Sequence, residues 1–162
     1  MVDITEISAI VAAAGVLVGV ALTVLELRNL VKQRQTDLVE RLYSIFISED
    51  FMTALLKTMN LEFEDYRGFV NKYGSFSLET PVNVAVRRVV YYYGEAGILL
   101  HKGLVDVDFL YQYMGGATMI WNKLKPLIEG YREQAGFNFG TWFEYLCNEM
   151  KKIEQQQTSK TA

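Results

Sequence analysis

The feature that most constrains this chain is an uncharged apolar run near its amino terminus, residues 7–25, which lies between Glu6 and Glu26. As a helix, these 19 residues extend about 28 Å, close to the roughly 30 Å hydrocarbon core of a bilayer. Ten of them are Ile, Leu or Val, and each of these favours insertion by roughly 0.3 to 0.6 kcal/mol. The run therefore predicts one transmembrane helix. A buried helix of a soluble core is the alternative, whereas the acidic leader MVDITE argues against a cleaved signal peptide.

Small side chains recur along one face of this predicted helix, at spacings of four, three, four and four residues. They are Ser8, Ala12, Gly15, Gly19 and Thr23. Small residues let two helix backbones approach closely in lipid, and Gly15 and Gly19 form a GxxxG pair. The face predicts lateral association, either with a second copy or with a membrane protein complex. A plain anchor in the bilayer is the alternative.

The residues that flank the run predict its orientation. Arg28, Lys32 and Arg34 follow it closely, and basic residues in short flanking segments stay on the cytoplasmic side. We therefore expect a single-pass protein of the cytoplasmic membrane, with residues 1–6 as a short extracytoplasmic amino terminus. The single cysteine, Cys147, forms no internal disulfide and suits a reducing compartment, which agrees with a cytoplasmic carboxyl-terminal domain.

The rest of the chain predicts an all-α fold. Apolar residues at helical spacing continue through residues 26–47, which we expect to form a juxtamembrane helix, either as a stalk or as part of the core. Residues 48–154 predict a compact cytoplasmic domain of five to six helices. The polar tail, residues 155–162, has little apolar surface to bury and is expected to be disordered.

Local signals mark several helix starts in this domain. Ser48 precedes two acidic residues and predicts a helix start. Thr80 followed by Pro81 is the clearest start signal, because Thr caps the helix and Pro lacks the amide hydrogen that would remain unpaired there. Thr141 with Glu144 predicts a capping box for the last helix.

Two further signals concern helix interiors. Pro126 predicts a kink or break near residues 123–125, because it removes a backbone donor and crowds the preceding turn. Gly94 and Gly97 form a small patch where another helix can pack closely.

Composition and motif searches exclude several functional classes. A net charge of −3 and a pI near 5.2 argue against nucleic-acid binding, which needs a clustered basic surface. The sequence has no HExxH, CxxC, P-loop, GxGxxG or GxSxG motif. The lone His101 is expected to stabilise a helix carboxyl end. We therefore predict no catalytic residue, no cofactor and no metal.

One stretch stands out as a candidate interaction surface or pocket. Arg87, Tyr91 and Glu95 lie at successive four-residue steps, which places them on one face of a helix, and Tyr92 adjoins them. We select Tyr91, Tyr92 and Glu95 as candidate binding residues. The alternative is a Glu95 that is simply exposed or structurally paired.

The segments YYGEAGILLHKGLVDVDFLYQYMGG, WNKLKPLI and WFEYLCNEM, preceded by an apolar span, resemble a family of short prokaryotic membrane-anchored helical proteins whose domain has no known function. The resemblance covers most of the chain and implies this architecture. It implies no activity, because the shared residues are packing and capping residues.

Three hypotheses of function follow. The first is a non-enzymatic accessory or regulatory subunit, whose small-residue face docks on a membrane protein complex and whose helical domain binds a cytoplasmic subunit. The second is a self-assembling homo-oligomeric membrane scaffold. The third is a small-molecule sensor or enzyme that uses the surface around Tyr91, Tyr92 and Glu95.

Overall fold

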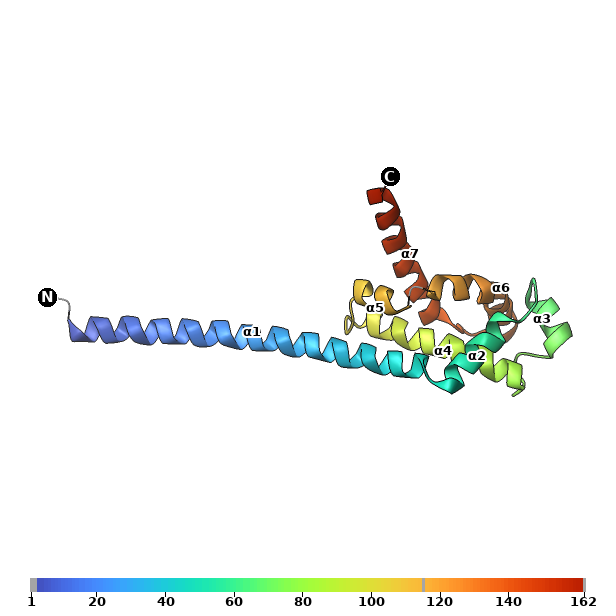
Figure 1. Ribbon diagram of the computed structural model, residues 1–162, viewed down its shortest axis with the longest axis horizontal. Helices are drawn as coiled ribbons and strands as arrows, with labels where there is room; N and C mark the ends of the chain where they lie inside the picture. The colour runs from blue at the N-terminus through green and yellow to red at the C-terminus, as the bar shows by residue number, and fades with distance from the viewer. Residues whose placement is uncertain (1–2, 115, 162) are drawn as a thin grey trace. The chain divides into compact units, whose positions relative to one another are not determined.

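Helices account for the regular structure of this chain. The structure, a computed structural model, describes residues 3–114 and 116–161. These residues form helices and no strand, which confirms the all-α prediction, and six helices follow the first, as expected (Figure 1). The helices are α1 (Ile4–Phe46), α2 (Glu49–Met59), α3 (Tyr66–Tyr73), α4 (Pro81–His101), α5 (Val107–Met114), α6 (Ala117–Ala135) and α7 (Thr141–Thr161).

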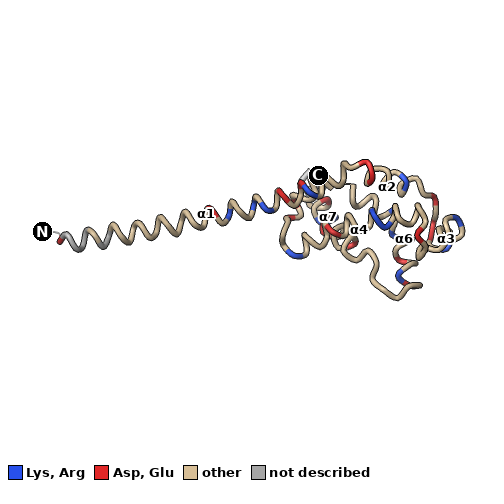
Figure 2. The backbone as a smooth tube through the Cα atoms, turned by 90° about the horizontal axis from the view of Figure 1, so that it is seen from below, with Lys and Arg blue, Asp and Glu red and all other residues tan. Residues whose placement is uncertain are grey.

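The chain divides into two units, Met1–Asp37 and Leu38–Ala162, which we describe separately. The first unit contains the apolar part of α1. Every residue from Val11 to Arg34 is exposed, and the helix carries no charge between Val11 and Leu25, where Figure 2 shows a tan tube. Among the described residues, α1 is the one helix that is long and apolar enough to cross a membrane.

The last turns of α1 belong to the second unit. Val39 and Leu42 are each only 2% exposed, and Ile45 and Phe46 pack against the same core. The segment 26–47 was expected to be either a stalk or part of the core. It is both, because residues 26–37 belong to the first unit and the helix joins the core of the second unit from Leu38 onward. The helix ends at Phe46, and the Ser48 hydroxyl then caps α2 by accepting from the Phe51 amide, as predicted.

Helix α4 is central to the second unit, since it packs against both α2 and α7 (Figure 1). The Thr80 hydroxyl accepts from the amide of Asn83 at 3.2 Å and Pro81 occupies the first turn, which confirms the predicted start. Val86, Val89 and Ala96 are fully buried at helical spacing along the inward face.

Two phenylalanines in loops also enter the core. Phe76 is fully buried and Phe139 is 5% exposed, with their ring centroids 5.5 Å apart. The loop that carries Phe76 is held by Asn83, whose amide nitrogen donates to the carbonyls of Ser75 at 2.8 Å and Leu78 at 2.9 Å. Asn83 is itself fully buried, so these two bonds satisfy its buried amide nitrogen.

Of the kink or break predicted near residues 123–125, the break is wrong. Helix α6 runs through Pro126, and the helical segment is instead interrupted between Met114 and Ala117. Leu124 and Leu127, on either side of the proline, are fully buried, so packing holds the helix together despite the missing donor. Gly116 precedes α6 without any side-chain cap.

The last helix differs from its prediction at both ends. The Thr141 hydroxyl donates to the carbonyl of Asn138 at 2.9 Å, and the Glu144 carboxylate accepts from Arg132 at 2.7 Å, so the predicted capping box does not form. Arg132 on α6 is charged, so it gives the Glu144 carboxylate a stronger hydrogen bond than a backbone amide does.

At its carboxyl end α7 continues to Thr161. The tail that was predicted to be disordered from residue 155 is therefore helical as far as Thr161.

The close approach of α4 and α7 depends on one glycine. A Cβ atom built on Gly97 would lie 2.0 Å from the carbonyl oxygen of Trp142, whereas one built on Gly94 would lie 3.9 Å from the nearest atom, the Cβ of Trp142. The small patch predicted from the sequence is therefore a contact for α7, and only Gly97 is essential to it.

We expect Gly97→Ala to lower the free energy of unfolding by about 1 to 3 kcal/mol, because the new methyl group forces α4 and α7 apart. Gly94→Ala is the matched control. It should leave stability unchanged or raise it by up to about 1 kcal/mol, because alanine favours the helix and meets no close atom. Denaturant unfolding of the full chain in detergent, followed by circular dichroism, measures both. Equal stabilities of the two variants would contradict the close crossing.

Candidate functional site

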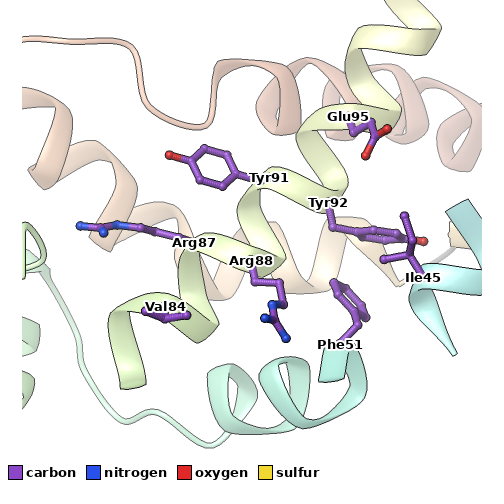
Figure 3. Close-up of a pocket in the computed structure, with 8 residues that line it drawn as sticks. All are labelled: Ile45, Phe51, Val84, Arg87, Arg88, Tyr91, Tyr92 and Glu95. Carbon is purple, nitrogen blue, oxygen red and sulfur yellow. The ribbon is translucent and has the colours of Figure 1, made fainter. Parts of the chain in front are cut away.

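Two adjoining hollows lie along the outward face of α4. The first has a volume of about 440 Å³ and the second about 280 Å³. Tyr91 and Glu95 line both, so these two residues form the boundary between the hollows. The first hollow (Figure 3) is lined by Ile45, Phe51, Val84, Arg87, Arg88, Tyr91, Tyr92 and Glu95. The second is lined by Val90, Tyr91, Gly94, Glu95, Ile98, Phe137, Asn138, Phe139, Gly140, Thr141 and Trp142.

Tyr92 is a structural part of this surface. Only 5% of it is exposed, its hydroxyl donates to the carbonyl of Leu42 at 3.1 Å, and its ring lies 4.3 Å from that of Phe51. Burial is the main cause that raises the pKa of its hydroxyl, and the nearby Tyr93 and Glu95 add to the effect. Tyr92 therefore joins α4 to the end of α1 and remains a neutral hydrogen-bond donor.

Tyr91 and Glu95, by contrast, are available to a partner. Tyr91 is 63% exposed, and its ring lies 5.8 Å from that of Phe139 at the edge of the second hollow. Glu95 is exposed, and among the described residues no ion pair involves it. A carboxylate between two apolar hollows can bind a cationic group from outside the chain.

Two arginines complete the surface. Arg87 donates to the carbonyl of Phe76 and lies over that ring, 5.1 Å from its centroid. Arg88 donates to the carbonyl of Asp50 at 3.2 Å and lies 3.5 Å from its carboxylate. The predicted row of Arg87, Tyr91 and Glu95 does line one hollow, but Arg87 is directed away from Glu95 (Figure 3).

Sequence reasoning found Tyr91, Tyr92 and Glu95, but it missed Val84 and Arg88 on α4 and the lining residues from other elements. Tyr91, Tyr92 and Glu95 come together as predicted, although Tyr92 is buried. Ile45 and Phe51 were missed because they come from the end of α1 and the start of α2, which no pattern within α4 reveals.

The small-residue face lies on the exposed part of α1. Cβ atoms built on Gly15 and Gly19 meet nothing within 4 Å, so both positions are open to a helix from outside the chain. The hydroxyl of Thr23 donates to the carbonyl of Gly19 at 2.9 Å, which satisfies this polar side chain within its own helix. Ser8 and Ala12 are exposed as well.

The titratable residues outside this surface form no metal site in the described part of the chain. His101 ends α4, as predicted, and its ring centroid lies 4.8 Å from that of Trp142 and 5.4 Å from that of Tyr145.

Cys147 is fully buried, and its thiol lies 3.5 Å from the carbonyl of Ala117. Burial raises the pKa of this thiol to about 12, so it stays protonated and unreactive at neutral pH.

Comparison with known proteins identifies a family. A family described as "Domain of unknown function (DUF4760)" matches residues 9–150. The matched range begins in the apolar part of α1 and ends in α7, so it includes residues of both units. No curated protein and no solved structure matches the chain.

The different roles of the two tyrosines can be tested by removing each hydroxyl. We expect Tyr92→Phe to lower the free energy of unfolding by about 1 kcal/mol, because it deletes a buried hydrogen bond. Tyr91→Phe is the control and should change stability little, because its side chain is exposed. Chemical denaturation of both variants measures the difference. A Tyr92→Phe variant as stable as the parent would contradict the buried bond to Leu42.

Proposed function

Since the chain belongs to the DUF4760 family, whose function is unknown, we propose a function from its own architecture. We propose that it is a non-enzymatic single-pass membrane protein that acts as an accessory or regulatory subunit. Its apolar helix docks on a membrane protein complex through the small-residue face, and its helical domain binds a cytoplasmic subunit. Its mechanism is binding and local concentration at the cytoplasmic membrane.

The observation that carries this proposal is the exposure of the apolar part of α1. Val16, Leu17 and Val18 are 66%, 71% and 58% exposed, and the residues around them are similar. In water this surface is unfavourable by about 25 cal/mol for each Å² of apolar area. A bilayer removes that cost, and the internal hydrogen bonds of a helix satisfy its backbone there.

The face of small residues supports docking on another helix. Lipid tails are as apolar as leucine, so helices in a bilayer associate through close packing rather than through the hydrophobic effect. The open positions at Gly15 and Gly19 allow such packing. The basic residues that follow the apolar stretch, Arg28, Lys32 and Arg34, support a cytoplasmic location for the helical domain (Figure 2).

The outward face of α4 supports the binding role of the helical domain. The two hollows present apolar area together with Arg88 and Glu95, which is the combination of anchoring and orienting groups that binding surfaces use. Two alternatives remain for the same surfaces. A homo-oligomeric scaffold would use Gly15 and Gly19 between copies, and a sensor would hold a small ligand in the first hollow.

One experiment separates these functions. Gentle detergent extraction of the protein from its own host gives the mass of the native assembly and identifies every chain that copurifies. A defined larger complex with another protein supports the accessory subunit. An assembly of this chain alone supports the scaffold and overturns the accessory role, and a monomer whose melting temperature rises with a small ligand supports the sensor.

We expect Gly15→Ile with Gly19→Ile to weaken lateral association of α1 by about tenfold or more, because the added side chains prevent close packing. The helical domain should unfold at the parent's denaturant concentration. Ala13→Ile with Ala21→Ile is the matched control, since it adds similar bulk to the opposite face. Crosslinking in vesicles measures association. Equal effects of the two pairs would show that the small-residue face has no special role.

A further inference from the structure

An apolar stripe on α4 has no cover in the second unit. Val84, Tyr91 and Ile98 are 45%, 63% and 40% exposed and follow one another at intervals of seven residues. Seven residues are close to two helical turns, so the three side chains lie along one line of the helix. The two hollows lie beside this stripe. Such a regular exposed stripe is typical of a helix that packs against another helix.

We propose that this stripe pairs with the same stripe of a second copy, with the two α4 helices antiparallel and a two-fold axis passing beside Tyr91. A two-fold axis brings each residue of one helix opposite the residue at the same distance on the other side of the centre. Val84 lies seven residues before Tyr91, and Ile98 lies seven after it. Val84 of one copy therefore meets Ile98 of the other, so apolar side chains pair at both ends of the stripe.

The charges on this face agree with the same symmetry. Glu95 lies four residues after Tyr91, and Arg88 lies three residues before it, so they occur at nearly the same level in an antiparallel pair. Both side chains lie on the flank of α4 that carries Tyr92 (Figure 3), and this two-fold axis places that flank beside the same flank of the second copy. The pair therefore gains two identical ion pairs, each between Glu95 of one copy and Arg88 of the other.

Glu95 is available for these contacts, and Arg88 has one exposed competing partner, Asp50. Glu95 is exposed and has no ion pair among the described residues. Arg88 faces Asp50 at 3.5 Å, but the side chains are 46% and 86% exposed, and such exposed pairs contribute little. The hollows on either side of Tyr91 give the tyrosine ring of the second copy apolar surface to cover.

A helix of another protein could cover an apolar stripe, but it would match these charges only by coincidence. A second copy matches them by symmetry, which is why we choose it. The pairing uses residues of the second unit alone, so it stands whether or not α1 docks on a membrane complex. It covers the outward face of α4, so a second copy and a cytoplasmic subunit compete for that face.

A charge exchange tests the pairing in the full chain in detergent. Arg88→Glu and Glu95→Arg should each weaken self-association by about tenfold or more, because each places two pairs of like charges across the axis. A mixture of the two variants should pair again. One contact then joins the introduced glutamate of the first variant to the introduced arginine of the second, and the other joins the native Glu95 of the first to the native Arg88 of the second. The Gly15→Ile, Gly19→Ile background weakens association through α1, and light scattering measures the mass. Failure of the mixture to pair would overturn the proposal.

Disulfide crosslinking tests the register. Tyr91→Cys should crosslink to itself, because this position lies beside the axis. Val84→Cys alone and Ile98→Cys alone should not, because identical positions then lie about 21 Å apart along the helices, too far for a disulfide. A mixture of these two should crosslink, and Leu56→Cys on α2, which is 58% exposed, measures random collision. Crosslinking of Tyr91→Cys no faster than Leu56→Cys would overturn the symmetric pair and leave the stripe to a different protein.

Discussion

The second unit depends on the close crossing of α4 and α7. Because Gly97 has no side chain, the backbone of α7 at Trp142 can lie against α4. Phe143 then stacks on Tyr93 with ring centroids 4.8 Å apart and meets Trp121 of α6 at 5.2 Å. Burial of these large rings supplies much of the favourable free energy of a small domain. The same contact fixes which face of α4 is turned inward, and it leaves the two hollows on the outward face.

Much of the fold follows from local chemistry in the sequence. The Thr80 cap and Pro81 determine the start of α4 without help from the rest of the chain. Where the structure departs from prediction, distant contacts outweigh local preference. Burial of Leu124 on one side of Pro126 and Leu127 on the other keeps α6 continuous, and no local rule contains that information. Phe76 is likewise hidden from helical periodicity because it enters the core from a loop.

The candidate site divides in the same way. Tyr91 and Glu95 could be found from the sequence because regular spacing on one helix places them on one face. Ile45 and Phe51 could not be found in this way. They lie at the end of α1 and the start of α2, and only the folded chain brings them beside α4. The face around Gly15 has no such contacts to compare, since, apart from the neighbouring backbone of the same helix, no atom of the described residues lies within 4 Å of a Cβ built on Gly15 or Gly19.

The burial of Cys147 has a consequence for the chemistry of the whole protein. The chain has one thiol, and in the folded state that thiol is enclosed and protonated. Oxidants attack thiolates that solvent can reach, so the thiol of the folded protein is protected from oxidation. Only a molecule whose α7 has separated from α4 and α6 presents the sulfur. Oxidation would then act as a selective trap that removes opened chains and leaves folded ones unchanged.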